Sequence, residues 1–575
     1  MERLNLHLSG IVIILLIMIS SCEEISDNIK NGQVNEDPAD YVWDENQAIR
    51  VSLNYNSITV VPSIASVSGG TLTIKSAGTY ILKGSLSDGQ IIVNTDDEEI
   101  VRLVLAGVNI NCSKSAPIFV KHAAKVIIVL EENTENHLAD GTTYATSDSE
   151  PNAAIFSNSY LSIHGQGTLT VTGNYNDGIS SDDGLLVKSG IITVNAADDG
   201  IRGKDYLIIR DGKITVNSGG DGLISDNTKG AGKGYLYVDQ GNINITSTGD
   251  AISAFTTLTI IDGIYTLTTI GGNAKSAEGP PTPPGGGGTT GGYSGTISAK
   301  GLKGLESVLI KTGTFHINSA DDGIHSDGNI TIDHGTFDIE SGDDAIHADK
   351  SVTINGGTIN ISGCYEGIES ALIRVNKGNI NLVATDDGFN ATKGNATEFN
   401  DGSSIEINGG FITVNCTKGD GLDSNGNISI YSGTIVVHGP QSQPEVGFDV
   451  NGVFKIDGGL FVATGPNSGN MIEVPASSSA QYSVRVIFQS TLTSSDLFHI
   501  KNSKGDNILT FKPVRNIYYI VVSCPELVNG SSYSIYTGGT STGTNIYGLY
   551  QEGVYTGGTL RKTFTVSSKI TGVSI

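Results

Sequence analysis

The sequence predicts an all-β fold, a parallel β-helix in which each coil takes about 22 residues. Three observations lead to this prediction: an acidic turn that recurs at that interval, short strand-like segments between the turns, and an apolar residue at one fixed position of every repeat. The repeat region is rich in Ile, Val, Thr and Asn and has no segment of helical period. A solenoid absorbs most of the 575 residues, because each repeat contacts only its neighbours.

The recurring turn places one acidic residue directly before a Gly or an Ala. We call these acidic residues the corner acids: Asp177, Asp199, Asp221, Asp250, Asp322, Asp344, Glu366, Asp387 and Asp420. Lys300 stands at the same position in one coil and interrupts the column. The Gly is expected to supply a positive φ at the corner, although Ala251 and Ala345 indicate that not every corner requires it.

The residue after this Gly or Ala is apolar in every coil. The column consists of Ile179, Ile201, Leu223, Ile252, Leu302, Ile324, Ile346, Ile368, Phe389 and Leu422. We therefore predict that it points into the core. Between two turns, residues 184–187 and 191–195 form short strand-like segments with no helix between them. Such strands cannot form a βαβ sheet, but each can pair with the same strand one coil away, at about 4.8 Å.

The N-terminus resembles a bacterial lipoprotein signal. Residues 1–22 contain an apolar run over 11–19 and end in small residues followed by Cys22, which would be acylated after cleavage. An ordinary signal peptide would leave Cys22 without a role. The following Glu23 and Glu24 look like the tags that send some lipoproteins to the outer face of the outer membrane. We therefore expect a lipid-anchored protein at the cell surface.

Composition divides the rest of the chain into segments. Residues 23–50 are polar and are expected to form a flexible tether, and the β-helix is expected over 51–470. Within it, the Pro- and Gly-rich residues 273–296 have too few apolar side chains to pack, which predicts an extended loop. The period is lost after the β-helix while β-formers persist, so 471–575 are predicted to form a small β-rich unit that caps the last coil.

Charge and cysteine content bound the partners and the redox chemistry. A net charge of -26 repels nucleic-acid phosphates and attracts divalent cations. Besides Cys22, the chain has Cys112, Cys364, Cys416 and Cys524, which allow three pairings. Their spacing matches no metal or disulfide framework, and we favour four lone buried thiols.

The column of corner acids requires a source of compensation. Neighbouring carboxylates about 4.8 Å apart repel each other by roughly 1 kcal/mol even at the dielectric constant of water. A second acidic column, four residues after the Gly, holds Asp182, Asp226, Asp327 and Asp349. Either some carboxyls are protonated, or backbone N–H groups at the turns satisfy them, or bound cations neutralise them. Because the ligands are hard oxygens, Ca²⁺ is the expected cation.

Ca²⁺ sites are expected where the two acidic columns coincide with a doubled Asp. The candidate ligands are Asp177, Asp182, Asp198, Asp199, Asp221, Asp321, Asp322, Asp327, Asp343, Asp344 and Asp349. The alternative is that each Asp caps its own backbone in an Asx-type turn and faces solvent. A column of Asn would supply the same caps without the repulsion, which favours cations.

Other polar residues near the turns allow a catalytic interpretation. His325 and His347 share one phase in adjacent coils, which is compatible with a metal pair but more typical of a surface ladder. Arg202 and Lys204 are candidate bases of a Ca²⁺-dependent lyase, or else they offset the acidic column. No serine-hydrolase elbow, Walker sequence, H-E-x-x-H motif or dinucleotide fingerprint occurs in a supporting context, although paired carboxylates alone do not exclude a glycosidase.

Four stretches of the chain resemble a bacterial cell-surface family of carbohydrate-binding domain-containing proteins. They are residues 77–84 (AGTYILKG), 150–156 (EPNAAIF), 174–179 (NYNDGI) and 198–205 (DDGIRGKD). The resemblance extends over roughly 50–470 and implies a right-handed parallel β-helix distantly similar to pectate lyases. It also implies Ca²⁺ at the acidic turns, recognition of a plant-type polysaccharide such as a pectic chain or cellulose, and no catalytic activity.

Together these features predict a lipid-anchored β-helix that binds polysaccharide through a Ca²⁺-bearing face. Ca²⁺ would bridge the uronate groups of an acidic polymer to an acidic protein. A neutral glucan would instead need exposed aromatic rings, for which Tyr175, Tyr206, Tyr235 and Tyr237 are candidates, although Tyr in strands more often packs internally. Two other classes stay open: a Ca²⁺-dependent polysaccharide lyase, and a structural surface stalk or adhesin.

Overall fold

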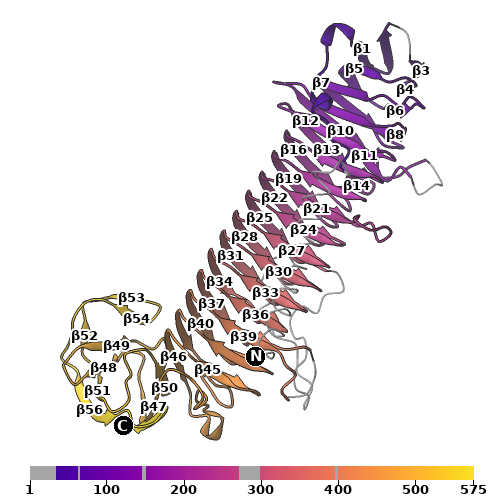
Figure 1. Ribbon diagram of the computed structural model, residues 1–575. Coiled ribbons are helices and arrows are strands. Elements are labelled where there is room, and N and C mark those ends of the chain that lie inside the picture. Colours follow the sequence, from indigo (N-terminus) through magenta and orange to yellow (C-terminus); the bar gives the residue numbers. More distant parts are fainter. Residues whose placement is uncertain (1–33, 63–64, 146–149, 271–297, 395–398) are drawn as a thin grey trace. The chain divides into compact units, whose positions relative to one another are not determined.

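The structure is a computed structural model, and it describes residues 34–62, 65–145, 150–270, 298–394 and 399–575 (Figure 1). These residues form two compact units, the first of the described residues up to 215 with 223–237 and the second of 216–222 with the described residues from 238 onward. Outside the described residues lie the predicted signal peptide 1–22 with Cys22, residues 23–33 of the predicted tether, and the predicted loop 273–296.

In the first unit, short parallel strands form ladders along the stack. The strands that follow the turns form the corner ladder: β4 (Thr71–Ile74), β6 (Gln90–Asn94), β8 (Ile118–His122), β11 (Ala153–Ser157), β14 (Asp177–Ser181), β17 (Ile201–Gly203) and β20 (Leu223–Ser225), with β3 (Ser66–Ser68) antiparallel at its edge. The long strands β1 (Ile49–Tyr55), β5 (Gly78–Leu86) and β7 (Val101–Cys112) also run parallel to one another, and β2 (Ser57–Val61) is antiparallel to β1. From β7 two ladders continue, one through β9 (Val126–Leu130), β12 (Leu161–Gly165), β15 (Gly184–Val187), β18 (Tyr206–Ile209) and β21 (Tyr235–Val238), the other through β10 (Glu135–Asp140), β13 (Thr168–Gly173) and β16 (Ile191–Ala196).

The second unit repeats the same three-strand coil (Figure 1). Its corner ladder contains β23 (Ile252–Ala254), β26 (Leu302–Gly304), β29 (Ile324–Ser326), β32 (Ile346–Ala348), β35 (Ile368–Ser370), β38 (Phe389–Ala391), β41 (Leu422–Ser424) and β44 (Phe448–Val450). The next ladder contains β24 (Thr257–Ile260), β27 (Ser307–Ile310), β30 (Asn329–Ile332), β33 (Ser351–Ile354), β36 (Leu372–Val375), β39 (Ser404–Ile407), β42 (Asn427–Ile430) and β45 (Phe454–Ile456). The third contains β22 (Asn242–Ser247), β25 (Ile264–Thr269), β28 (Thr314–Ser319), β31 (Thr336–Ser341), β34 (Thr358–Gly363), β37 (Asn379–Ala384), β40 (Phe411–Cys416), β43 (Thr434–His438) and β46 (Leu460–Gly465).

The register of these ladders confirms the predicted stacking. Ile324 pairs with Ile346, and Ile346 pairs with Ile368, each one repeat further along the chain. The apolar column after the turn is fully buried along its whole length, as predicted. The rings of Tyr265 and Phe315 also stack in parallel, with centroids 4.6 Å apart. The all-β prediction and its long parallel sheets therefore hold, and the arrangement is that of a β-solenoid.

The parallel stacking ends in the C-terminal part of the second unit. Strand β46 pairs antiparallel with β50 (Ile517–Ser523), which also pairs with β47 (Ser483–Leu492), and β47 runs parallel to β57 (Ile570–Ser574). A further sheet contains β53 (Thr544–Ile546), β54 (Leu549–Gln551), β49 (Asn507–Phe511), β48 (Phe498–Asn502), β51 (Ser532–Thr537) and β56 (Thr559–Thr565), and β52 (Thr540–Ser541) pairs with β55 (Tyr555–Thr556). The strand pairing thus covers the edge of β46, and the domain limits predicted at 470 and 471 stay predictions.

The glycines of the acidic turns have a different function from the predicted one. Gly178 and Gly323 are not among the residues with positive φ, whereas Gly190 and Gly335 in a later turn of the coil are. The prediction of a positive φ at the acidic corner is therefore wrong. A Cβ atom at Gly178 would instead lie 2.2 Å from the Val194 side chain. The corner requires a small residue because the next strand packs directly against it.

The described end of the predicted tether is packed onto the first unit. It contains two short 3₁₀ helices, η1 (Pro38–Tyr41) and η2 (Glu45–Gln47), while η4 (Gly469–Met471) lies in the second unit. Asp40 forms a buried ion pair with Lys125, and Glu36 contacts Arg210 at 2.9 Å. For residues 34–50 the prediction of a flexible tether is therefore wrong, because one buried and one half-buried ion pair hold this segment in place.

Two further expectations concern the cysteines and the membrane. Cys112, Cys364, Cys416 and Cys524 are all buried and unpaired with one another, which confirms the prediction of lone thiols. Within the described ranges, no helix has the length and apolar character needed to cross a bilayer.

The buried ion pair of the N-terminal segment can be tested by mutation. Asp40→Ala is expected to lower the free energy of unfolding of the first unit by about 3 kcal/mol, because it leaves the ammonium of Lys125 buried without its partner. Glu45→Ala breaks the exposed pair with Arg50 and should cost less than about 1 kcal/mol. Chemical denaturation measures both. Equal effects of the two variants would show that residues 34–50 do not dock as described.

Candidate functional site

Most corner acids of the second unit are bonded to the coil that follows them. One carboxylate oxygen accepts the backbone N–H of the residue at the equivalent corner position of the next coil. These bonds run from Asp250 to Asp221 (2.7 Å), from Lys300 to Asp250 (2.8 Å), from Asp344 to Asp322 (3.2 Å), from Glu366 to Asp344 (3.3 Å) and from Asp420 to Asp387 (2.6 Å). The corner acids thus cap backbone donors between coils.

This geometry corrects the Asx-turn alternative. That alternative expected each Asp to cap its own backbone and to face solvent, whereas Asp250, Asp322 and Asp344 are buried and cap a different coil. An isolated buried carboxylate is costly, and the cap uses only one of its two oxygens. The second oxygen therefore needs a positive partner or a proton.

The residue three positions after each corner supplies the neighbouring side chain. Strand pairing aligns these residues in one column, which we call the facing column: Lys303, His325, His347, Glu369, Asn390, Asp423 and Asp449. Along the second unit this column changes from basic through imidazole to acidic. Compensation of the corner acids therefore differs from coil to coil.

The first coils of the second unit are compensated internally. Lys303 Nζ lies 2.8 Å from Asp250, and Lys300 Nζ lies 2.8 Å from both Asp321 and Asp322. Burial opposes ionisation of Asp322, but the Lys300 ammonium and the bond from His325 hold the pKa of this carboxyl below its usual range. Lys300 interrupts the acidic column in sequence, yet in space it is the counter-ion of the next corner acid.

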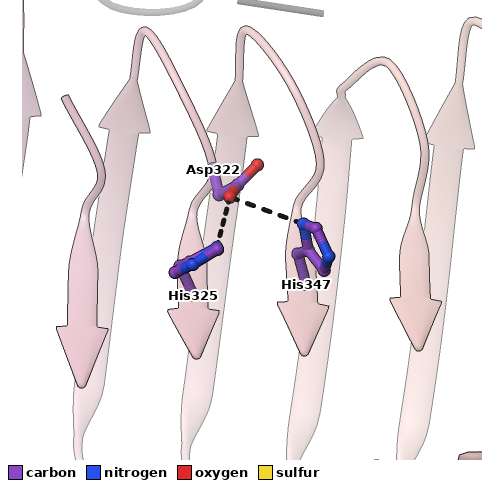
Figure 2. A group of neighbouring side chains, drawn as sticks. All are labelled: Asp322, His325 and His347. Carbon is purple, nitrogen blue, oxygen red and sulfur yellow. Dashed lines mark hydrogen bonds and ion pairs between the residues drawn. The ribbon is translucent and has the colours of Figure 1, made fainter. Parts of the chain in front are cut away.

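The two histidines lie between both acidic columns and are not a fully exposed surface ladder. Figure 2 shows the carboxylate of Asp322 next to the imidazoles of His325 and His347, with Nδ1 distances of 2.7 and 3.8 Å. Their side chains are 13% and 21% exposed, and their rings meet edge to face at 5.2 Å. On the other side, His325 Nε2 lies 3.0 Å from Asp327 and His347 Nε2 lies 3.7 Å from Asp349.

Further along the second unit, the corner acids lack such compensation. Burial and neighbouring carboxylates raise the pKa of Asp344, Glu366 and Asp387 well above the usual range, and burial raises that of Asp420 to about 9. Asn390 donates to Glu366 at 2.8 Å, while its own Oδ1 is buried and has no partner among the described residues. These oxygens need protons or a cation.

In the first unit an arginine compensates part of the acidic edge. Arg202 contacts Asp182 at 3.2 Å and Asp226 at 3.0 Å, and Lys204 contacts Asp182 at 3.4 Å. Burial lowers the pKa of Arg202, but the carboxylates of Asp226, Asp182 and Asp177 together offset this and raise it above the ordinary value. Arg202 is therefore placed as a counter-ion of the acidic edge. Burial, with the charge of the neighbouring Asp199, raises the pKa of Asp177 to about 8.

Only some of the predicted Ca²⁺ ligands come together as sets of three. Four sets of carboxylates and imidazoles have ligand atoms within 4.8 Å of one another: Asp322, His325 and His347; Asp344, His347 and Glu369; Asp321, Asp322 and Asp343; and Asp420, Asp423 and Asp449. Within the described part of the chain, none of these sets includes the predicted ligands Asp177, Asp182, Asp198, Asp199, Asp221, Asp327 or Asp349.

Sequence reasoning missed the acidic end of the facing column. Glu369, Asp423 and Asp449 were not among the predicted ligands, and the corner acid Asp420 was also left out. The available signal was the residue three positions after each corner, which is charged or an imidazole in most coils of the second unit. This column is recognised only when the coils are aligned on the corner acids.

Most of the candidate aromatic residues do not form a surface. Tyr206 and Tyr235 are buried and stacked on each other, with centroids 5.4 Å apart. Tyr175 is 43% exposed and stacks on Tyr144 at 4.2 Å. Tyr237 is only partly buried and lies against Arg210. Of the four candidates, only Tyr175 is therefore exposed in the part of the chain that the structure describes.

Comparison with known proteins places most of the repeat region in one family. The family model for carbohydrate-binding domain-containing proteins matches residues 68–345 and 343–461. A carbohydrate-binding domain-containing protein of Acetivibrio thermocellus is 42% identical over 134 residues, which are 23% of this chain and 47% of that protein. The chain thus spans about half the length of this relative.

A solved structure is also similar to part of the chain. It is described as a polysaccharide lyase-like protein from C. thermocellum, in a gadolinium derivative. The sequences are 34% identical, the TM-score is 0.38, and the match covers 39% of this chain and 91% of that one.

The raised pKa values predict how stability depends on pH in the absence of divalent cations. Asp177 and Asp420 have folded pKa values of about 8 and about 9, against an ordinary value of 3.8. The folded state therefore binds more protons than the unfolded state, so the stabilising contribution is present below about pH 4 and is lost as the pH rises toward 8 or 9. Melting curves in chelator should shift to lower temperature over this range. A flat profile would contradict the buried, uncompensated carboxyls.

At Asp387, the effect of the hydrogen bond to the next coil can be measured separately from the effect of the negative charge. Asp387→Asn keeps an oxygen for the N–H of Asp420 and removes the charge, so stability in chelator should be unchanged or higher. Asp387→Ala leaves that N–H without an acceptor and should cost about 1–3 kcal/mol. Chemical denaturation in chelator compares the two variants. If both were equally destabilised, the cap would not be the function of the carboxylate.

Proposed function

The chain belongs to the family of carbohydrate-binding domain-containing proteins, and from this premise we propose that it binds an acidic polysaccharide through Ca²⁺ held at the corner acids. The coils would be wound in the right-handed sense that the family resemblance implies. The partner would be a polymer of uronic acids, as in pectic chains, and binding would not be accompanied by cleavage. The observation that carries this proposal is the cluster of carboxylates formed by Asp420, Asp423 and Asp449 at the acidic end of the second unit.

The donor atoms at this end fit a hard divalent cation. Asp420, Asp423 and Asp449 offer carboxylate oxygens within 4.8 Å of one another, and Asp420 forms no ion pair with a described basic side chain. The buried Oδ1 of Asn390 adds an oxygen without a partner in the same facing column. Oxygen-only sets of carboxylates and amide carbonyls are what Ca²⁺ prefers. Asp420, Asp423 and Asp449 are therefore the residues proposed to hold it.

A cation also accounts for the attraction between an acidic protein and an acidic ligand. The chain carries a net charge of -26 and would repel a polyuronate without a bridging ion. Bound Ca²⁺ supplies positive charge and open coordination positions that carboxylates of a polymer can occupy. The regular spacing of the coils suits a polymer with a repeating carboxylate.

A second candidate partner is a neutral glucan such as cellulose. The observation that favours it is the exposed ring of Tyr175, which Tyr144 supports from behind at 4.2 Å. Stacked aromatic rings offer the flat apolar surface on which a sugar ring packs. This candidate would not depend on Ca²⁺, which distinguishes it from the first.

The lyase alternative gains no support from its candidate bases. Arg202 is held between two carboxylates, and Lys204 lies 3.4 Å from Asp182. A base must be able to give up its proton, and paired cations resist this. We therefore infer binding without catalysis.

The setting of this activity is inferred from the first residues of the chain. Cys22 follows a signal-like segment, and its acylation would anchor the protein in the outer membrane at the cell surface. Such an anchor would present the coils to extracellular polysaccharide.

Binding to insoluble polygalacturonate in Ca²⁺ and in chelator tests the proposal. Retention is expected in Ca²⁺ and should fall at least about tenfold in chelator or in Asp423→Asn, which removes one of the proposed oxygens. Asp338→Asn changes the net charge equally at an exposed position outside the corner columns and should bind normally.

Three outcomes would contradict the proposal. Release of unsaturated product, followed by its absorbance, would indicate a lyase. Retention on cellulose in chelator, lost in Tyr175→Ala, would favour the neutral glucan. Retention on no glycan would favour a structural surface protein.

A further inference from the structure

His347 lies where the facing column changes from basic to acidic. It belongs to β32, and strand pairing places it opposite Glu369 in β35. Its Nδ1 is 3.5 Å from Oδ2 of Asp344, the corner acid of its own coil. One ligand atom from each of these three residues lies within 4.8 Å of the other two. This juxtaposition joins one imidazole to two carboxylates from adjacent coils.

We propose that Asp344, His347 and Glu369 form a binding site for a divalent transition metal of the Zn²⁺ class. An imidazole nitrogen is a borderline ligand that suits Zn²⁺, Co²⁺ or Ni²⁺, whereas Ca²⁺ takes oxygen ligands. Tetrahedral Zn²⁺ with bonds of about 2.0–2.1 Å separates its ligands by roughly 3.3 Å. The distance of 3.5 Å between His347 and Asp344 is close to this value.

The neighbouring histidine is less suited to a metal, because its partners are already in place. His325 Nδ1 and Nε2 lie 2.7 and 3.0 Å from Asp322 and Asp327, within hydrogen-bonding distance. The same Asp322 carboxylate also accepts a hydrogen bond from the Lys300 ammonium at 2.8 Å, and this positive charge would repel a dication.

His347, in contrast, forms no close hydrogen bond through either ring nitrogen with any residue that the structure describes. Its contacts to Asp322, Asp344 and Asp349 measure 3.8, 3.5 and 3.7 Å, which is longer than a side-chain hydrogen bond. Within the described part of the chain, no Lys or Arg forms an ion pair with Asp344. The imidazole therefore has no close hydrogen bond to lose, and Asp344 keeps one oxygen that does not cap the N–H of Glu366.

The surroundings of His347 also resemble the second shell of a metal site. Metal-bound imidazoles commonly direct their other ring nitrogen toward a carboxylate, which fixes the ring orientation. Asp349 lies 3.7 Å from His347 Nε2 and is placed for this role. Three protein ligands would leave one position for water. The bound ion would also join β32 to β35 and so stabilise two adjacent coils.

Titration of the full folded chain with Co²⁺ at neutral pH, in a large excess of Ca²⁺, tests this site. Co²⁺ is the probe because its visible absorption reports nitrogen and oxygen coordination. We expect one saturable site, whose affinity for Co²⁺ falls at least tenfold in His347→Asn and in Glu369→Gln. His325→Asn is the matched control on the adjacent coil and should bind Co²⁺ within about twofold of the unmodified chain.

Two results would overturn the assignment. Unchanged Co²⁺ binding in His347→Asn would exclude this histidine as a ligand, and an equal loss in His325→Asn would place the ion at Asp322 instead. Melting curves of every variant in chelator identify loss of folding. A Zn²⁺-induced rise in melting temperature for the unmodified chain and His325→Asn, absent in His347→Asn and Glu369→Gln, would support the site independently of absorbance.

Discussion

The hydrogen bond from a corner N–H to the carboxylate of the preceding coil is the constraint on which the functional edge depends. It needs a side-chain acceptor at the same position of successive coils, and it buries that acceptor against a small residue and a strand. An aspartate meets this need but brings a charge with it. The second oxygen of this aspartate then depends on its neighbours, and the facing column differs in charge from coil to coil.

The charge that surrounds the corner acids changes along the second unit. In its first coils, the ammonium groups of Lys303 and Lys300 and the imidazole of His325 lie against the corner acids. In its last coils, Asp423 and Asp449 face Asp420, and the group gains further negative charge. The same backbone arrangement thus has one part in which basic side chains compensate the corner acids and another part in which the acidic side chains favour a cation. The proposed polysaccharide contact lies on the second part, and the proposed transition-metal site lies at the change between them.

The repeat made much of the fold predictable. The apolar column from Ile179 to Leu422 is buried as predicted, and the thiols are buried and unpaired, because a fixed period determines which residues stack and face inward. Predictions about single positions were less successful. Composition suggested a tether for residues that in fact pair Asp40 with Lys125, since a polar segment can dock through buried ion pairs that composition does not show. At corners such as Gly178, the space left for a Cβ and not the φ angle favours glycine.

By itself, the sequence determined the period, the all-β stacking, the buried apolar column and the existence of an acidic edge. The tertiary structure decided which acids are compensated. Lys300 appeared to interrupt the column but is a counter-ion of Asp322, and His347 has acidic neighbours in its own and the adjacent coils. The physical reason is that alignment by period gives the order of residues in a column. The direction of each side chain, and therefore the partner of each charge, depends on contacts between adjacent coils that are distant in sequence.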